Sequence, residues 1–171
     1  MDIMLNVINM NLKNKMPFQY NKKVMQHFLK AKHVGKIENA DGIGKVGNMT
    51  CGDVMYIYIK VGKKGGDEII KDIKFETLGC PAAIATSDII ASLAKGKSLN
   101  EAMKITNKEV VKALGELPAA KYHCSLLAEE GLGEAIYDYL KKNGRKIPSE
   151  LEKKHKKAIA SKKEFECRYG K

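Results

Sequence analysis

The sequence predicts an α+β fold, in which an antiparallel sheet exposes one face to solvent and carries helices on the other. Apolar residues alternate along 54–61, where one face is formed by Met55, Ile57, Ile59 and Val61. A turn expected at 62–67 leads to a return strand with Ile73, Phe75 and Thr77 facing inward. The outward positions of the return strand are charged, at Asp72, Lys74 and Glu76, and one solvated face is typical of an antiparallel sheet. The chain after residue 80 is predicted to be helical.

The chain before the hairpin predicts one short helix and little other regular structure. Residues 1–15 are rich in Asn and Lys and are expected to be loosely ordered. Asn21 is a predicted N-cap, and Val24, Phe28 and Leu29 give the following helix an apolar face. Next comes a loop-rich segment with room for one short strand, punctuated by Gly35, Gly42, Gly44 and Gly47.

The helices after the hairpin are marked by their ends. Cys80 stands at or next to the N-cap of a buried helix that has Pro81 in its first turn and Gly96 after its end. Two capping boxes follow, which predict two short helices: Ser98 with Glu101, and Thr106 with Glu109.

The last two predicted helices differ in how much they can bury. The helix after Cys124 has apolar residues at four-residue spacing and ends at Gly144. Gly131 and Gly133 within it each cost about 1 kcal/mol relative to Ala, which indicates a close packing contact. A final Lys-rich helix, capped by Ser149, has only Leu151 and Ile159 to bury, so we expect it to be peripheral.

Length and charge limit the organisation and the partners. A chain of 171 residues predicts one domain at 16–144, with a loosely ordered extension at 1–15 and a Lys-rich helical extension at 145–171. The net charge of +11 comes almost entirely from Lys, with Arg only at positions 145 and 168. Nucleic-acid recognition favours Arg and interleaved aromatic residues, so we expect a solvated surface that attracts acidic proteins and no nucleic-acid partner.

The sequence shows no pattern of a secretory signal or a membrane span, which predicts a reducing compartment for its four cysteines. Asp2, Asn6 and Asn9 interrupt any apolar core of a secretory signal, and no run of about 18 apolar residues predicts a membrane span. We therefore expect a cytoplasmic protein, in which cysteines are more often metal ligands or nucleophiles than disulfides.

Three of the four cysteines are expected to meet at one end of the sheet. Cys51 precedes the first strand of the hairpin and Cys80 follows the second, and these two strand ends are adjacent in an antiparallel hairpin. Cys80 and Cys124 both lie at helix N-termini, where the helix dipole favours a thiolate. His123 and Asp53 add an imidazole and a carboxylate.

These ligand types suit zinc, as Cys3His or Cys3Asp, or an iron–sulfur cluster. Spacing alone leaves the choice open, because there is no C-x-x-C motif and Asp53 can equally cap a turn. A Cys124–His123 nucleophile pair is the weaker alternative, since no oxyanion-hole pattern accompanies it. Cys167 is expected to be a free thiol without a defined role, and the remaining histidines to have no clustered partners: His27, His33 and His155.

Residues 18–142 resemble the iron–sulfur cluster assembly scaffold family of the IscU and NifU N-terminal type. The matching blocks are 19–28, Cys51-Gly52-Asp53-Val54-Met55, Phe75 to Ala85 with Gly79-Cys80-Pro81, 95–99, and Leu117 to Ala128 with Lys121-Tyr122-His123-Cys124-Ser125. Each of the three cysteines lies inside a matching block, in the order of the family.

The resemblance implies a three-stranded antiparallel sheet and a scaffold, not an enzyme. It implies that Cys51, Cys80 and Cys124, with His123 or Asp53 as the fourth ligand, hold a transient 2Fe–2S cluster, with Zn²⁺ or Fe²⁺ possible at the same site. Sulfur would arrive as persulfide from a cysteine desulfurase, with Cys124 as its acceptor. The other implied partners are an iron donor, an electron-donating ferredoxin and apo-protein acceptors.

Some features depart from the family pattern or stay open. Leu117-Pro118-Ala119-Ala120-Lys121 replaces Leu-Pro-Pro-Val-Lys, which leaves recognition by an Hsp70-type chaperone doubtful. A related branch of the fold is a zinc-bound persulfide acceptor; it carries an insertion between the second and third cysteines, for which the 44-residue step from Cys80 to Cys124 leaves no obvious room. Oligomeric state stays open, including a homo-oligomer bridged by a cluster.

Overall fold

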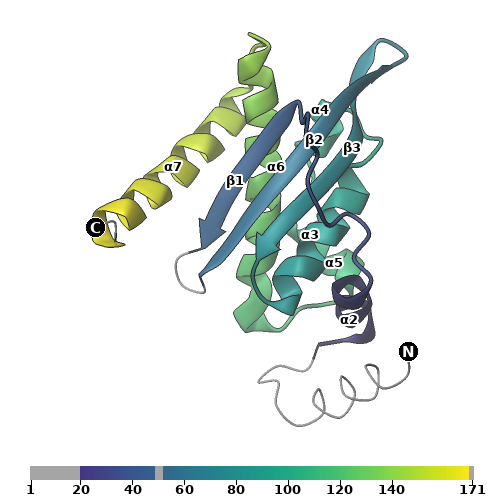
Figure 1. Cartoon of the computed structure of the whole chain (residues 1–171), viewed down its shortest axis with the longest axis vertical. Coiled ribbons are helices and arrows are strands. Elements are labelled where there is room, and N and C mark those ends of the chain that lie inside the picture. Colours follow the sequence, from purple (N-terminus) through teal and green to yellow (C-terminus); the bar gives the residue numbers. More distant parts are fainter. Residues whose placement is uncertain (1–19, 49–51, 170–171) are drawn as a thin grey trace.

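The molecule is built on a three-stranded antiparallel sheet (Figure 1), and the computed structural model describes residues 20–48 and 52–169 of it. The strands are β1 (Gly42–Asn48), β2 (Asp53–Lys64) and β3 (Asp67–Leu78), in the order β1-β2-β3. Helix α3 (Pro81–Ala94) packs against β3, and helix α6 (Tyr122–Lys142) packs against β1 and β2, on the same face of the sheet. The predicted α+β architecture is confirmed.

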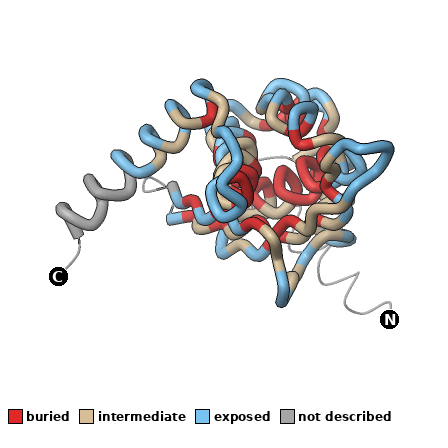
Figure 2. The backbone as a smooth tube through the Cα atoms, turned by 90° about the horizontal axis from the view of Figure 1, so that it is seen from above, coloured by how far each residue is buried: buried red, intermediate tan, exposed pale blue. Residues whose placement is uncertain are grey.

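The remaining helices surround this two-layer core, in which the buried residues gather (Figure 2). They are α2 (Lys22–Leu29), α4 (Leu99–Ala102), α5 (Asn107–Leu114), the 3-10 helix η1 (Ala119–Lys121) and α7 (Ser149–Tyr169). Both predicted capping boxes are present, with Ser98 N–H and Thr106 N–H donating to Glu101 and Glu109 at 2.9 and 2.8 Å. Within the described ranges, no helix has the length and apolarity needed to cross a membrane.

Helix α7 is peripheral, as predicted, but it buries less than expected. Leu151 is 5% exposed against the core, whereas Ile159 remains 39% exposed. Polar contacts also hold the helix to α6: Lys154 Nζ lies 2.8 Å from Glu129 Oε1, and His155 Nδ1 lies 2.8 Å from Glu134 Oε2. Cys167 lies in the last turns of α7, and its side chain is not among those that the structure describes.

Strand β1 occupies the segment whose glycines suggested loops. A Cβ atom on Gly44 would overlap the carbonyl oxygen of Gly131 in α6 and lie 2.7 Å from the backbone nitrogen of Ala135. The glycines therefore let α6 approach the backbone of β1 directly. Gly131 makes the close packing contact predicted for it, with Ile57 and Val46, whereas a Cβ on Gly133 would meet only Leu151 at 3.6 Å.

The β2–β3 hairpin is longer than its sequence pattern indicated. The turn consists of Gly65 and Gly66 alone, with φ values of +59° and +93°. These left-handed conformations suit glycine in a two-residue turn. The predicted turn at 62–67 is therefore too wide, because β2 continues through the exposed lysines to Lys64 and β3 begins at Asp67.

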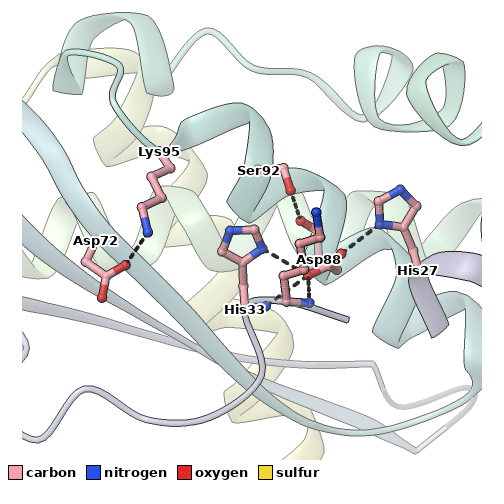
Figure 3. A network of polar contacts seen from close by, with 7 residues as sticks. His27, His33, Asp72, Asp88, Ser92 and Lys95 are labelled. Atoms are coloured by element: carbon pink, nitrogen blue, oxygen red, sulfur yellow. Dashed lines mark hydrogen bonds and ion pairs between the residues drawn. The ribbon is translucent and has the colours of Figure 1, made fainter. Parts of the chain in front are cut away.

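Helix α2 is fastened to α3 by a buried carboxylate (Figure 3). Asp88, 1% exposed, lies 2.7 Å from His27 Nδ1 and 2.9 Å from His33 Nδ1, and its Oδ1 also accepts the backbone N–H groups of Lys32 and His33. Burial would raise the pKa of Asp88, but these hydrogen bonds outweigh it and lower the pKa. The expectation that the three histidines have no clustered partners is wrong, because each of them contacts a carboxylate: His27, His33 and His155. The carboxylates lie 21 to 61 positions away in the sequence, so no local pattern indicated these contacts.

We expect Asp88→Asn to lower the free energy of unfolding by about 2–4 kcal/mol at pH 7. Asp88 has a folded-state pKa below its unfolded value of about 3.9, so its contribution is present above that value and is lost as the pH falls through the folded-state pKa. Urea unfolding from pH 7 downward should show the two proteins converging below about pH 4. The control is Asp72→Asn, which breaks the exposed ion pair with Lys95 at 2.8 Å and should cost less than about 1 kcal/mol. Equal costs for the two variants would contradict the assignment.

Candidate functional site

Three elements bring chemical groups together at one end of the sheet. Val54 pairs with Leu78, so the first residue of β2, Asp53, lies beside the segment Gly79-Cys80 that follows β3. The first turn of α6 adds His123 and Cys124. Asp53 and Cys124 are 4% and 0% exposed, whereas Cys80 is partly exposed. Topology therefore assembles this site, as predicted from the strand ends and helix starts.

The distances among these groups fit a bound metal ion. The Sγ atoms of Cys80 and Cys124 are 3.7 Å apart, and Cys124 Sγ lies 3.8 Å from Asp53 Oδ2. Ligand atoms of Asp53, His123 and Cys124 all lie within 4.8 Å of one another. Two sulfurs bound tetrahedrally to one metal at about 2.3 Å would be about 3.8 Å apart, so the cysteines need no rearrangement to share a ligand.

One ring nitrogen of His123 is available to bind a ligand at this end of the sheet. Its Nε2 is buried and has no hydrogen-bond partner among the described residues. An unsatisfied buried nitrogen costs about 1–3 kcal/mol, which a metal ligand bond would offset. Both groups that the sequence offered as a fourth ligand, His123 and Asp53, are therefore in place beside the sulfur atoms.

The surroundings of Cys80 favour its thiolate form. A hydrogen bond from Cys124 is the main cause that lowers the pKa of Cys80 to about 5, with further help from the backbone N–H of Ala83 and the charge of Lys121. Burial and the carboxylate of Asp53 oppose this shift. Cys80 is the N-cap residue of α3, with Pro81 in the first turn, as its sequence context indicated.

Two residues of the site were not identified from the sequence. Tyr20, just before α2, hydrogen-bonds Cys80; burial, followed by the nearby thiol groups of Cys80 and Cys124, raises the pKa of its hydroxyl to about 12. Gly79 leaves space for the carboxylate of Asp53, because a Cβ there would lie 3.0 Å from Asp53 Oδ1 and 2.9 Å from Ala83 Cβ. Tyr20 could have been identified from its position in the first block that matches the family, and Gly79 from its position directly before Cys80.

Cys51 lies outside the described residues, so its predicted proximity to Cys80 stays a prediction. The neighbouring Gly52 is described and has φ +72°, a left-handed conformation that turns the chain into β2. Lys121 is the N-cap residue of α6 and acts electrostatically on Cys80.

Comparison with known proteins gives one family and many relatives. The family model described as "NifU-like N terminal domain" matches residues 19–146. "Iron-sulfur cluster assembly scaffold protein IscU 1" of Archaeoglobus fulgidus is 56% identical over 126 residues, which cover 74% of this chain and 80% of the relative. The IscU scaffold protein of Rickettsia prowazekii is 45% identical over 133 residues, which cover 76% of this chain and 98% of the relative.

A third relative extends the similarity beyond the family match. The IscU scaffold protein of Aquifex aeolicus is 42% identical over 160 residues, covering 91% of this chain and 99% of its own. Such coverage cannot be reached without part of α7. Among solved structures, a protein named as an iron–sulfur cluster assembly scaffold for the SUF system of Fervidobacterium islandicum aligns with a TM-score of 0.57 and 25% identity, over 68% of this chain and 96% of that chain.

Proposed function

The chain belongs to the NifU-like N-terminal domain family of iron–sulfur cluster scaffolds, and from this premise we propose how its residues assemble and release a cluster. Its function is to carry a cluster that is built from iron and sulfur and passed to other proteins. We infer that the cargo is a 2Fe–2S cluster, held by Cys51, Cys80 and Cys124 with Asp53 or His123 as the fourth ligand. Zn²⁺ or Fe²⁺ would occupy the same groups.

The observation that supports this proposal best is the convergence of four ligand groups from three elements. Cys80, Cys124, Asp53 and His123 lie together at the end of the sheet, with the two sulfur atoms 3.7 Å apart. Permanent clusters are most often held by four thiolates, and one carboxylate or imidazole in place of a thiolate makes a bond to cluster iron that is easier to exchange. Such a mixed ligand set suits a protein that must release what it binds.

The proposed partners follow from this chemistry. A cysteine desulfurase supplies sulfur, which Cys124 holds as a persulfide; an iron donor and an electron-donating ferredoxin complete the cluster, and apo-proteins accept it. The protein binds and positions the reactants and is not itself an enzyme. We also propose that residues 16–144 form the scaffold domain between extensions at 1–15 and 145–171; the family match ends at residue 146, three residues before α7 begins.

Anaerobic reconstitution tests the function. We expect ferrous iron, cysteine and a cysteine desulfurase to produce 2Fe–2S absorption bands that move to an apo-ferredoxin. Cys51→Ser and Cys80→Ser should abolish the bands, because each removes a thiolate ligand. Cys167→Ser is the matched control and should leave them unchanged. Persulfide on Cys124 with bound zinc and no chromophore would instead favour the sulfur-acceptor branch of the fold.

A further inference from the structure

The positive charge of the chain is concentrated in its last part. Residues 145–171 carry ten Lys and Arg side chains against four Asp and Glu side chains, which gives +6 of the net charge of +11. Most of this segment is α7, which begins after the family match has ended at residue 146. The groups proposed to hold the cluster all come before residue 125, so they give α7 no part in the function.

The described turns of α7 point lysine side chains away from the molecule. Leu151 and His155 face α6: Leu151 is 5% exposed, and His155 Nδ1 lies 2.8 Å from Glu134 Oε2. About half a helical turn away from these contacts, the helix carries three exposed lysines. We call them the lysine face: Lys153, Lys156 and Lys157.

Helix α7 carries the lysine face along the outside of the molecule, back toward the end of the sheet that holds the site. Its first turns contact the second half of α6, where Lys154 Nζ lies 2.8 Å from Glu129 Oε1, and the helix runs in the direction opposite to α6. In Figure 1 its far end lies at about the height at which β1 and β3 end. A protein held on the lysine face would therefore stand beside the ligand groups without covering them.

We propose that the lysine face docks an acidic protein, the acceptor of the cluster. This inference rests on the proposed function and adds the surface through which the scaffold captures that partner. Lysine ammonium groups are point charges on flexible stems, so they attract a carboxylate-rich surface without requiring one fixed geometry. Such attraction raises association rates about 10- to 1000-fold at low ionic strength.

The ion pair within the lysine face does not prevent docking. Lys156 Nζ lies 3.1 Å from Glu152 Oε1, one helical turn earlier, yet the side chain of Lys156 is 73% exposed. Exposed pairs of this kind are weak, so Lys156 can exchange Glu152 for a carboxylate of the partner.

The composition of α7 favours a protein over a membrane or a nucleic acid. A helix that lies in a membrane surface presents a continuous apolar face. Among the described side chains of α7, Leu151 is turned to the core, and Ile159 stands alone at 39% exposure. Nucleic-acid recognition favours Arg and interleaved aromatic residues, and the lysine face has neither.

Charge reversal in the full-length protein tests the proposal. The first variant combines Lys153→Glu with Lys157→Glu on α7. The matched control combines Lys63→Glu with Lys64→Glu, two exposed lysines at the end of β2 beside the hairpin turn, at the opposite end of the sheet from the site. Both variants lower the net charge by the same amount, so a difference between them reports the position of the charge.

The acceptor in this assay is a strongly acidic apo-ferredoxin. At about 0.01 M salt we expect the α7 variant to transfer its cluster at least tenfold more slowly than the wild type, and the hairpin variant to stay within about twofold. In about 1 M salt, where the Debye length is about 3 Å, all three proteins should transfer at one low rate. Equal slowing by the two variants, or a difference that persists in 1 M salt, would overturn the proposal.

Binding in the absence of a cluster separates docking from the scaffold function. Isothermal titration calorimetry with the same apo-ferredoxin should give the α7 variant a Kd at least tenfold above that of the hairpin variant. This difference without cluster formation on any of the proteins would reject the scaffold function and keep the docking surface. Normal cluster formation with equal Kd values would reject the docking surface alone. Lysine-dependent binding of RNA or of anionic phospholipid vesicles, without binding of the acidic protein, would also overturn it.

Discussion

The substitution Gly44→Ala is expected to lower the free energy of unfolding by about 3 kcal/mol or more. The added methyl group would overlap the carbonyl oxygen of Gly131 and lie 2.7 Å from the nitrogen of Ala135, both in α6. Both obstacles are backbone atoms, so no side-chain rotation can make room. The strand and the helix must separate, which opens the main contact between the two layers of the core. Urea unfolding monitored by circular dichroism measures the loss.

Strand β1 itself offers the matched control. A Cβ on Gly47 would meet Asp53 O at 3.5 Å and Val54 Cγ2 at 4.0 Å, which are ordinary contact distances. We expect Gly47→Ala to change the free energy of unfolding by less than about 1 kcal/mol. If both alanine substitutions lowered the free energy of unfolding by a similar amount, the cause would be the loss of glycine from the strand. The close approach of α6 would then not explain the effect at position 44.

Removal of the Asp53 carboxylate is expected to slow cluster transfer to an apo-ferredoxin at least tenfold. Asp53 is 4% exposed and lies within 3.8 Å of Cys124, so its negative charge faces anionic sulfur ligands in a poorly hydrated place. That repulsion, together with the loss of one thiolate bond to cluster iron where a carboxylate takes its place, favours release of the cargo. Asp53→Ala removes both effects and leaves His123 as the proposed fourth ligand.

The rate constant for transfer, followed by the visible absorption of the acceptor, measures this effect. Asp53→Asn keeps the shape of the side chain and removes the charge, so it should share the slow transfer if repulsion is the main cause. Asp72→Asn removes a partly exposed carboxylate that pairs with Lys95 and should transfer at the wild-type rate. Unchanged or faster transfer by Asp53→Ala would contradict the role of Asp53.

Much of the fold was predictable because its signals are local. The alternation at Met55, Ile57 and Ile59 gave strand β2 and its buried face, and Ser98 and Thr106 gave the starts of α4 and α5. Strand β1 was not predictable in the same way. Its inward positions include glycines, which display no apolar period, and the reason for them is the backbone of α6, about 90 residues further along the chain.

The sequence predicts the site residues that strand ends and helix starts bring together. It does not predict those that depend on how one helix docks on another. Strand ends and helix starts bring Cys80, Cys124, Asp53 and His123 together. The contact of Tyr20 with Cys80 depends instead on how α2 docks on α3, through Asp88, more than 50 residues away in the sequence. No local pattern reports such a docking, so Tyr20 was not singled out, and His27 was expected to lack a partner.

The attachment of α2 has a thermodynamic consequence for the site that it covers. Val24 is the one fully buried residue of this helix, and polar contacts contribute to its attachment, including three carbonyls at 114–116 that accept from the amide of Asn21 at 2.9 Å. Because heat capacity and denaturant sensitivity follow the apolar surface exposed, detachment of α2 would change both by much less than global unfolding. The segment that places Tyr20 on Cys80 can thus open in a local, weakly temperature-dependent event. The ligands on β2, α3 and α6 belong to the apolar core, whose unfolding depends steeply on temperature.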